Sequence, residues 1–184
     1  MNSEIIQRKK ALRKEMKKIK KALTGEQRKK KSASVMGKIE QHPAFRRAEK
    51  IFIFWSMDDE VDTRDFVLKW SHRKKFILPA INGDELHLKE FTGVHKLIFG
   101  DIYAIPEPEG KPFKDYEEIE LALIPGVAFD RENNRMGRGK AYYDRILCKI
   151  KDKAKLIGVC YDFQIVDKVP VEPHDIKMDK IICG

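Results

Sequence analysis

The sequence predicts an α/β fold of three layers, in which a mostly parallel sheet is flanked by helices and preceded by a basic helical hairpin. With 184 residues, the chain is long enough for one domain with a proper core and leaves little room for a second. From residue 48 onward, short apolar stretches without strict alternation are separated by helical stretches, which is typical of strands buried on both faces. We therefore expect a single domain, residues 1–184.

The N-terminal part is predicted to form a helical hairpin over about residues 3–41. Thr24 and Gln27 have the spacing of a capping box, so a second helix is expected to start there and to end near Gln41. The first helix, over about residues 3–23, is predicted by apolar residues that recur on one stripe: Ile5, Leu12, Met16, Ile19 and Leu23. The α/β body then covers about residues 48–184.

Basic residues are concentrated in this hairpin. Residues 1–50 contain 17 Lys and Arg against 5 Asp and Glu, while the whole chain has a net charge of +9. A basic arm of this kind is typical of nucleic-acid-binding modules, and the alternative is a solvated helix face rich in good helix formers. We favour the solvated face and expect no nucleic-acid partner, and the binding module stays as the competing hypothesis.

The body is predicted to alternate strands and helices. An Asn82-Gly83 turn separates two of the strands, and Asp62 or Thr63 is the expected N-cap of the first helix. The expected strands cover residues 50–55, 75–80, 85–91, 120–124, 155–161 and 180–183. The expected helices cover residues 63–72, 92–99 and 139–150.

The location of the protein is indicated by what the sequence lacks. No apolar run approaches the roughly 18 residues that cross a membrane, and the start has no apolar stretch of a secretory signal. The three cysteines, Cys148, Cys160 and Cys183, are widely spaced and form no C-x-x-C pair, which argues against a disulfide framework or a zinc site. We expect a monomer in the reducing cytoplasm, without a membrane partner.

The ligand site is expected at one edge of the predicted sheet. In open α/β sheets, ligands bind beyond the carboxyl ends of the strands. That rule selects the loops at residues 56–63, 79–80, 125–130 and 162–164. Because these are also the loops of the sequence with the most side chains suited to chemistry, two separate observations indicate the same edge.

A basic glycine segment at residues 134–144 is the strongest candidate for an anion site. Gly137 and Gly139 let the backbone turn sharply and present successive N–H groups, while Arg135, Arg138 and Lys140 supply positive charge. The helix expected to begin here adds the dipole of its N-terminus. The segment is neither a Walker A loop nor G-x-G-x-x-G. We predict that it binds a nucleoside triphosphate, with a basic surface turn as the alternative.

Acidic residues near this segment could hold a metal ion. Asp144 follows the glycines by about one helical turn, and Mg²⁺ is usually bound by one or two carboxylates together with phosphates. Alternatively, Asp144 only stabilises the start of the helix. Near the C-terminus, Asp175 and Asp179 frame a second acidic site, with capping or turn roles as the alternative. Tyr142 either stacks on a ring or fills core space.

Two further places carry charged side chains whose role is not obviously structural. Glu60 lies close to Trp55, and a carboxylate beside an aromatic face suits a flat heterocycle with N–H donors; the alternative is a solvated acidic loop. Lys9 lies within the apolar stripe of the first helix, and Arg13 lies at its edge. Lys9 therefore either extends along the apolar surface to reach water or meets an anion where the helix joins the body.

Taken together, these residues resemble the 5-formyltetrahydrofolate cyclo-ligase family, whose members are also called methenyltetrahydrofolate synthetases. The resemblance covers nearly the whole chain, and the order and spacing of its pieces are highly specific. The matching pieces are Lys9, Arg13, Asp59-Glu60-Val61-Asp62-Thr63, Leu78-Pro79, Pro106-Glu107-Pro108, residues 124–130, residues 134–144, Gln164 and the stretch from Asp175 to Asp179.

The resemblance implies that ATP and Mg²⁺ are used to convert 5-formyltetrahydrofolate to 5,10-methenyltetrahydrofolate, by phosphorylation of the formyl oxygen and ring closure by N10, with release of ADP and phosphate. It places ATP on Lys9, Arg13, Arg135, Met136, Gly137, Arg138, Gly139, Lys140, Ala141, Tyr142 and Tyr143. It places Mg²⁺ on Asp144 and Asp179. It places the reduced folate on Trp55, Glu60, Arg138, Gly139, Lys140, Ala141 and Tyr142. Arg138, Lys140 and Glu60 are the residues expected to act in catalysis.

Two places depart from the family's pattern. Ala141 stands where a glycine is usual, and its methyl group restricts the backbone at the rim of the anion site. Asn133 and Asn134 replace a glycine-containing turn, which we expect to form because Asn tolerates the left-handed conformation. Neither change removes a charge or a ligand. A folate or nucleotide carrier without turnover, caused by Ala141, is a third hypothesis.

Overall fold

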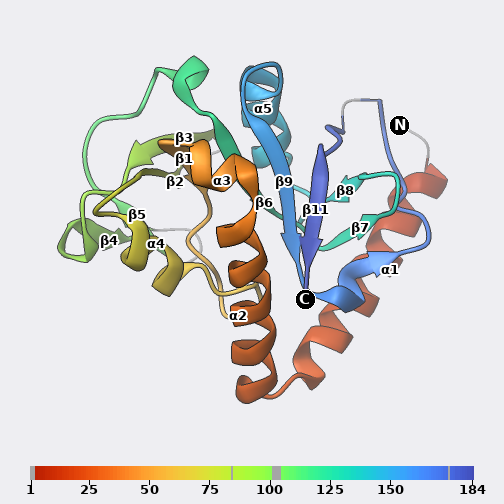
Figure 1. Ribbon diagram of the computed structural model, residues 1–184. Coiled ribbons are helices and arrows are strands. Elements are labelled where there is room, and N and C mark those ends of the chain that lie inside the picture. The colour runs from red at the N-terminus through yellow and green to blue at the C-terminus, as the bar shows by residue number, and fades with distance from the viewer. Residues whose placement is uncertain (1–2, 84, 101–104, 174) are drawn as a thin grey trace.

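A six-stranded sheet lies at the centre of the computed structural model (Figure 1). The structure describes residues 3–83, 85–100, 105–173 and 175–184. Within these residues the strand order is β11 (Lys180–Cys183), β9 (Lys155–Cys160), β6 (Leu121–Pro125), β1 (Lys50–Ile53), β2 (Lys75–Asn82) and β3 (Glu85–Glu90). All neighbouring strands are parallel except β2 and β3, which are antiparallel. The mostly parallel sheet and its six predicted strands are confirmed, with ends that shift by one or two residues.

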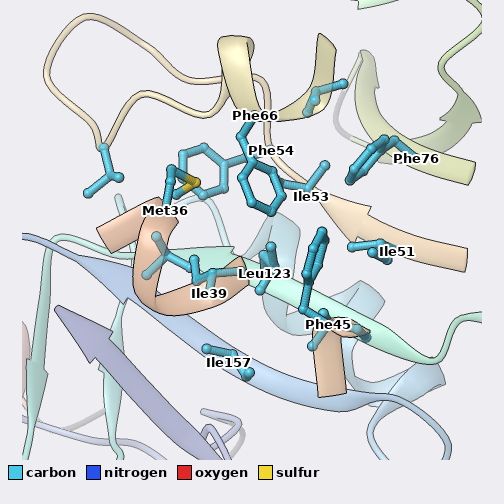
Figure 2. Packing of buried hydrophobic residues seen from close by; sticks show 14 of the residues in the cluster. Met36, Ile39, Phe45, Ile51, Ile53, Phe54, Phe66, Phe76, Leu123 and Ile157 are labelled. Carbon is cyan, nitrogen blue, oxygen red and sulfur yellow. The ribbon is translucent and has the colours of Figure 1, made fainter. Parts of the chain in front are cut away.

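Three helices cover one face of this sheet. They are α2 (Gly25–Gln41), α3 (Pro43–Arg47) and α4 (Arg64–Trp70). Figure 2 shows Ile39, Phe45 and Phe66 of these helices packed around Ile53 and Leu123 of the strands. Each of these five side chains is at most 4% exposed, and burying a side chain of this size contributes about 1.5–3 kcal/mol.

The opposite face is covered by α5 (Tyr142–Ile150), which confirms the three-layer architecture. Ile146, Leu147 and Ile150 of this helix are buried and pack in a cluster with Phe52 and Ile124. Successive strand residues point to opposite faces, so Phe52 meets α5 while its neighbours meet the other helical layer. Strands that are buried on both faces therefore appear in the sequence as continuous apolar runs.

The first helix, α1 (Ser3–Ala22), packs on a second, smaller sheet. Figure 1 shows that α1 and α2 diverge from their connecting turn and that α1 runs beside β7 and β8. The small sheet has the order β10 (Ile165–Val166), β7 (Ala128–Asp130) and β8 (Arg135–Met136). Met16 of α1 is buried with Val127 and Met136. The two predicted helices of the hairpin are confirmed, but each covers a different part of the body.

Side-chain caps explain where two of the helices begin. Gln27 N donates to Thr24 Oγ1 over 3.2 Å and Thr24 N donates to Gln27 Oε1 over 2.9 Å, so the predicted capping box is confirmed. At α4, Arg64 N donates to Asp62 Oδ1 over 3.0 Å. Thr63 occupies the N-cap position without a side-chain cap and instead donates to the Phe54 carbonyl over 2.7 Å. Of the two candidate caps, the carboxylate of Asp62 therefore provides the hydrogen bond.

Two predicted helices require correction. The helix predicted at residues 92–99 is wrong, because a 3₁₀ turn, η1 (Val94–Lys96), leads into β4 (Leu97–Phe99), which pairs antiparallel with β5 (Pro106–Pro108). A short apolar run does not distinguish helix from strand, and here the run finds a strand partner. The helix predicted from residue 139 begins at Tyr142, because Gly139 and Ala141 have φ values of 104° and 52°.

The remaining described elements are two short 3₁₀ turns, η2 (Tyr116–Glu118) and η3 (Asp162–Gln164). In η3, Tyr161 N donates to Gln164 Oε1 over 2.9 Å, and Gln164 Nε2 donates to the Gly126 carbonyl over 2.8 Å. Gln164 thereby ties the end of β9 to the loop after β6. None of the helices in the described part of the chain has the length and apolar character that crossing a membrane requires.

Candidate active site

A pocket of about 370 Å³ lies at the carboxyl ends of the central strands. Its lining includes Trp55 after β1 and Pro125 at the end of β6, and α1 and residues 135–144 complete it. The pocket has the size of a small-molecule site and the position expected for an open α/β sheet. It brings together the predicted ATP and folate residues and Asp144; Asp179 is not part of its lining.

The glycine segment packs closely against two arginines. Arg13 Nε of α1 donates to the Gly137 carbonyl over 3.0 Å. A Cβ atom on Gly139, where φ is 104°, would lie 3.3 Å from Arg13 Cζ, and one on Gly137 would lie 3.0 Å from Arg135 Nη1. The left-handed backbone at Gly139 favours glycine, and at both positions a side chain would push a guanidinium group away by a few tenths of an ångström.

Arg135 lies beneath this segment and is paired with Asp144. Its Nη2 lies 2.7 Å from Asp144 Oδ1, its Nη1 donates to the Pro125 carbonyl over 3.3 Å, and its guanidinium group lies 5.7 Å from the Tyr143 ring centroid. Within the described residues, Arg135 Nε has no hydrogen-bond partner. The Arg135 side chain is only 2% exposed, so it needs the carboxylate of Asp144 as its counter-ion.

Arg138 connects the glycine segment to the loop after β1. Its Nη2 donates to Glu60 Oε1 over 3.0 Å and to Asp59 Oδ1 over 2.6 Å. Glu60 Oε2 accepts from Met57 N over 3.0 Å, and the Glu60 side chain is only 11% exposed. A predicted phosphate-binding residue and a predicted folate-binding residue are therefore in direct contact.

Trp55 and Tyr143 are held rigidly by aromatic packing. The Trp55 ring stacks on Phe91 with centroids 5.7 Å apart, and the Tyr143 ring stacks on Phe52 with centroids 5.9 Å apart. Burial raises the pKa of Tyr143, so its hydroxyl stays protonated. Tyr142 is half-buried at the pocket, and its hydroxyl lies 3.4 Å from the Gly83 carbonyl, to which it donates.

Lys9 meets an anion rather than extending to water. Its Nζ lies 2.8 Å from Glu172 Oε2 and 2.7 Å from Asp175 Oδ2. Burial alone would lower the pKa of Lys9, but the hydrogen bonds to Asp175 and Glu172 outweigh it and raise the pKa above that of an ordinary lysine. The second interpretation of this lysine is therefore confirmed, and the anions that it meets here are carboxylates of the chain itself.

Asp179 lies at the other edge of the sheet from Asp144, so the predicted metal pair is not brought together. Asp179 Oδ2 accepts from Leu156 N over 2.7 Å, at the amino ends of β9 and β11. Asp144 lies in the first turn of α5, at the carboxyl ends of the strands. Asp175 lines the pocket instead. Asp175 stands four positions before Asp179, and the chain between them leaves the pocket to enter β11, so the metal role of either residue stays a prediction.

The pocket has carboxylates that suit a metal ion carried with a nucleotide. Asp144 and Asp175 both line it, and each is paired with a cation, Arg135 and Lys9 respectively. Among the described residues there is no group of three or more His, Cys, Asp or Glu arranged as a metal cage. Mg²⁺ does not need one, since one or two carboxylates suffice when phosphate oxygens and water complete its octahedron. The donor set therefore fits nucleotide-bound Mg²⁺ better than a metal held by the protein alone.

Comparison with known families assigns the chain to one of them. Residues 5–184 match the model of the 5-formyltetrahydrofolate cyclo-ligase family. The chain belongs to this family. It is therefore an enzyme of the cyclo-ligase type, and the resemblance drawn from its motifs is confirmed.

Individual relatives align along almost their whole length. The 5-formyltetrahydrofolate cyclo-ligase of Mus musculus is 28% identical over 195 residues, which cover 95% of this chain and 92% of that one. The cyclo-ligase of Haemophilus influenzae is 29% identical, with coverage of 97% and 98%. The structure of the 5,10-methenyltetrahydrofolate synthetase of Aquifex aeolicus has a TM-score of 0.84 and 32% identity, with coverage of 95% and 89%. That of Mycoplasma pneumoniae has a TM-score of 0.76 and 25% identity, with coverage of 95% and 97%.

Both departures of this cyclo-ligase from its family's pattern fall on left-handed residues. Asn133 has a φ of 65°, and its N–H donates to the Asp130 carbonyl over 3.0 Å, so the expected turn is confirmed. Ala141, at the N-cap position of α5, has φ 52° and ψ 18°. An L-residue in this conformation costs about 1–2 kcal/mol, which gives a physical reason for the glycine that is usual there.

We expect Ala141→Gly to stabilise the protein by up to about 1 kcal/mol, since the strain that it relieves exceeds the backbone entropy that a glycine loses on folding. Urea denaturation measures the change. Ala11→Gly, on the exposed face of α1, is the matched control and should cost about 1 kcal/mol. Loss of stability in Ala141→Gly equal to that of the control would show that Ala141 is not strained.

Three charged residues around the pocket were not predicted from the sequence: Lys20, Asp59 and Glu172. Lys20 carried a usable signal, because it follows Lys9 by 11 residues, three helical turns, and so lies on the same buried stripe of α1. Asp59 belongs to the loop motif that resembles the family, but nothing in that motif indicates its ionic partner, and Glu172 carried no signal, since an acidic residue in a loop is usually solvated. Their contacts with Lys20 and Lys9 depend on how α1 docks on the body.

Proposed function

We propose that this cyclo-ligase uses Mg-ATP to convert 5-formyltetrahydrofolate to 5,10-methenyltetrahydrofolate, with release of ADP and phosphate. The observation that supports it is a single pocket with two chemically different parts. One part is cationic, with Lys9, Arg13, Arg135, Arg138 and Lys140. The other is largely apolar, with Phe54, Trp55, Pro79, Ile81, Leu86 and Ile105. A triphosphate suits the first part and a pterin suits the second.

The cationic part can bind the phosphates through charge and through the backbone. Arg138 and Lys140 have exposed side chains that flank Gly139, and Arg13 packs over the same glycine. The backbone N–H groups at the start of α5 add donors and the positive end of the helix dipole. Asp144 and Asp175 would hold Mg²⁺, which supplies neutralising charge on the phosphate oxygens.

The apolar part can orient the folate ring. Glu60 lines the pocket beside Arg138, with its carboxylate fixed by Met57 N and Arg138. An ionised carboxylate accepts hydrogen bonds from the ring N–H and amino groups of a pterin, and the indole of Trp55 offers an adjacent flat surface. This arrangement would direct the N5-formyl group toward the cations.

The reaction then needs positioning and charge neutralisation rather than a protein nucleophile. The formyl oxygen attacks the γ-phosphorus, an O–P bond forms, and ADP leaves. N10 attacks the carbon of the resulting N5 iminium phosphate, the C–O bond breaks, and the proton of N10 leaves with the phosphate. Arg138 and Lys140 stabilise the charge that develops on the transferred group, as phosphoryl transfer requires.

The test is to mix the protein with 5-formyltetrahydrofolate and Mg-ATP and to follow the absorbance of 5,10-methenyltetrahydrofolate. The proposal predicts product that requires both ATP and Mg²⁺ and forms with one ADP per turnover. A carrier would bind folate or nucleotide without forming product. A nucleic-acid-binding module would instead bind RNA or DNA with steep salt dependence and without ATP consumption. Either of those results would overturn the proposal.

We expect Glu60→Gln to lower kcat/KM for the folate by about tenfold to a hundredfold, the value of losing a hydrogen bond to a charged group. Steady-state kinetics with the folate varied at saturating Mg-ATP measures the loss. Asp58→Asn, an exposed acid in the same loop, is the control and should have no effect. Unchanged folate affinity and turnover in Glu60→Gln would remove this residue from the folate site.

A further inference from the structure

Four charged side chains from three distant parts of the chain form a continuous ionic cluster beside the pocket. Lys20 of α1 lies with its Nζ 3.4 Å from Asp59 Oδ2. Asp59 Oδ1 accepts from Arg138 Nη2 over 2.6 Å, and the same nitrogen donates to Glu60 Oε1 over 3.0 Å. The charges alternate in sign along the series Lys20, Asp59, Arg138, Glu60.

Lys20 is the member of this cluster that the proposed reaction does not use. It is only 5% exposed, it is not part of the pocket lining, and Arg28 Nη2 fixes its backbone carbonyl over 3.1 Å. Burial lowers the pKa of Lys20, and the positive charge of Arg138 lowers it further, while Asp59 opposes both. Burying an ammonium group is unfavourable, and the ion pair that it forms often does not repay that cost. The presence of the buried Lys20–Asp59 pair therefore needs an explanation.

Arg138 has two sets of partners that compete for it. In this structure one nitrogen of its guanidinium group is shared by two carboxylates, while its side chain is 43% exposed and borders the pocket. A nucleotide phosphate offers a third acceptor. To form a bidentate pair with that phosphate, Arg138 must release Nη2 from one of these carboxylates, and when that carboxylate is Asp59, Lys20 remains as the counter-ion of Asp59.

We propose that Lys20 is a positioning residue that neutralises Asp59 and so allows Arg138 to transfer from Asp59 to the phosphates of ATP. Without Lys20, the departure of Arg138 would leave Asp59 as an unpaired, partly buried carboxylate, and Asp59 would hold Arg138 back. The cluster therefore exchanges one ion pair for another when nucleotide binds, with no net loss of pairing. This inference rests on the proposed use of ATP.

The test is a double-mutant cycle of Lys20→Met and Asp59→Asn, both of which keep the shape of the side chain. Two measurements are made on each variant: kcat/KM for Mg-ATP at saturating folate, and equilibrium binding of Mg-ATP without folate. Lys20→Met should weaken both by about tenfold while KM for the folate is unchanged. The double variant should return to within about twofold of the wild type, because removing both charges frees Arg138.

Two outcomes would overturn the role of Lys20. One is a Lys20→Met variant with wild-type binding and kcat/KM for Mg-ATP. The other is a double variant no better than Lys20→Met, which would mean that Lys20 only braces α1 against the loop. If Lys20→Met does not fold, the double variant still tests the proposal, since it buries no unpaired charge, and weaker Mg-ATP binding by it than by the wild type overturns the role of Lys20.

The same experiment separates this inference from the proposed function. A wild-type protein that binds Mg-ATP but forms no methenyltetrahydrofolate overturns the proposed reaction, while the binding measurements still decide the role of Lys20. A wild-type protein that does not bind Mg-ATP overturns both. A wild-type enzyme that turns over, with a cycle that shows no rescue, overturns only the role of Lys20.

Discussion

Asp144→Asn is expected to lower the Mg²⁺-dependent turnover by at least about a hundredfold, while Asp179→Asn stays within about twofold of the wild type. Asp144 lines the pocket in the first turn of α5, where a carboxylate can hold the metal that neutralises the phosphates. Asp179 is at the far edge of the sheet and accepts a hydrogen bond from Leu156 N. Turnover is measured as methenyltetrahydrofolate formation over a range of Mg²⁺ concentrations.

The Asp144 result must be separated from a loss of folding. Asp144 is also the counter-ion of Arg135, whose side chain is 2% exposed, and removal of one partner from a buried pair costs about 3–5 kcal/mol. Asparagine keeps an oxygen that can accept from Arg135 Nη2, so part of this cost is avoided. Thermal unfolding of both variants identifies the conditions under which each is folded. A folded Asp144→Asn enzyme with wild-type turnover would remove Asp144 from the metal site.

Arg138→Met is expected to lower kcat by about a hundredfold or more, the loss seen when one donor to a developing charge is removed. Its guanidinium group borders the pocket next to Gly139 and connects the glycine segment to Glu60. The loss should appear in kcat as well as in kcat/KM, because the interaction strengthens as charge develops on the transferred phosphoryl group. Steady-state kinetics with Mg-ATP varied separates the two parameters.

Arg131→Met is the matched control for Arg138→Met. Arg131 is an exposed arginine in the turn between β7 and β8, seven residues earlier, and is not part of the pocket lining. Its replacement should leave kcat unchanged. Equal losses in the two variants would mean that overall positive charge, and not the position of Arg138, governs the rate.

The layers of this fold could be predicted because the apolar runs that produce them are short, continuous segments of the sequence. Strands buried on both faces need continuous apolar runs, and residues 121–125 are all buried between α5 and the other helical layer. The strand β4 could not be predicted in the same way. Its three residues become a strand only because Pro106–Pro108 lies beside them, and a three-residue run has no periodicity of its own.

The candidate site could be predicted where the chemistry is concentrated in one segment. Gly137, Arg138 and Gly139 are adjacent, and Lys9 is conspicuous as a charge on an apolar stripe. The choice between Asp175 and Asp179 could not be made from the sequence. Both are acidic residues before the last strand, and only the path of the chain into β11 decides which of them faces the pocket.

The contact between Lys20 and Asp59 shows a second limit of prediction from the sequence. The two residues are 39 positions apart, and they meet because α1 docks on the small sheet while the loop after β1 extends toward it. Periodicity identifies Lys20 as buried but does not name its partner. Electrostatic partners across a tertiary interface therefore require coordinates, even where the buried charge itself can be found in the sequence.

The measurement that tests the account most directly follows the formyl oxygen. The enzyme is supplied with Mg-ATP and with 5-formyltetrahydrofolate that carries ¹⁸O in its formyl group, in unlabelled water, and the released phosphate is analysed by mass spectrometry. In the proposed mechanism the formyl oxygen attacks the γ-phosphorus and its C–O bond then breaks, which predicts one ¹⁸O atom in each phosphate. Unlabelled phosphate formed alongside 5,10-methenyltetrahydrofolate would contradict it, since ATP would then be cleaved by water and not by the substrate.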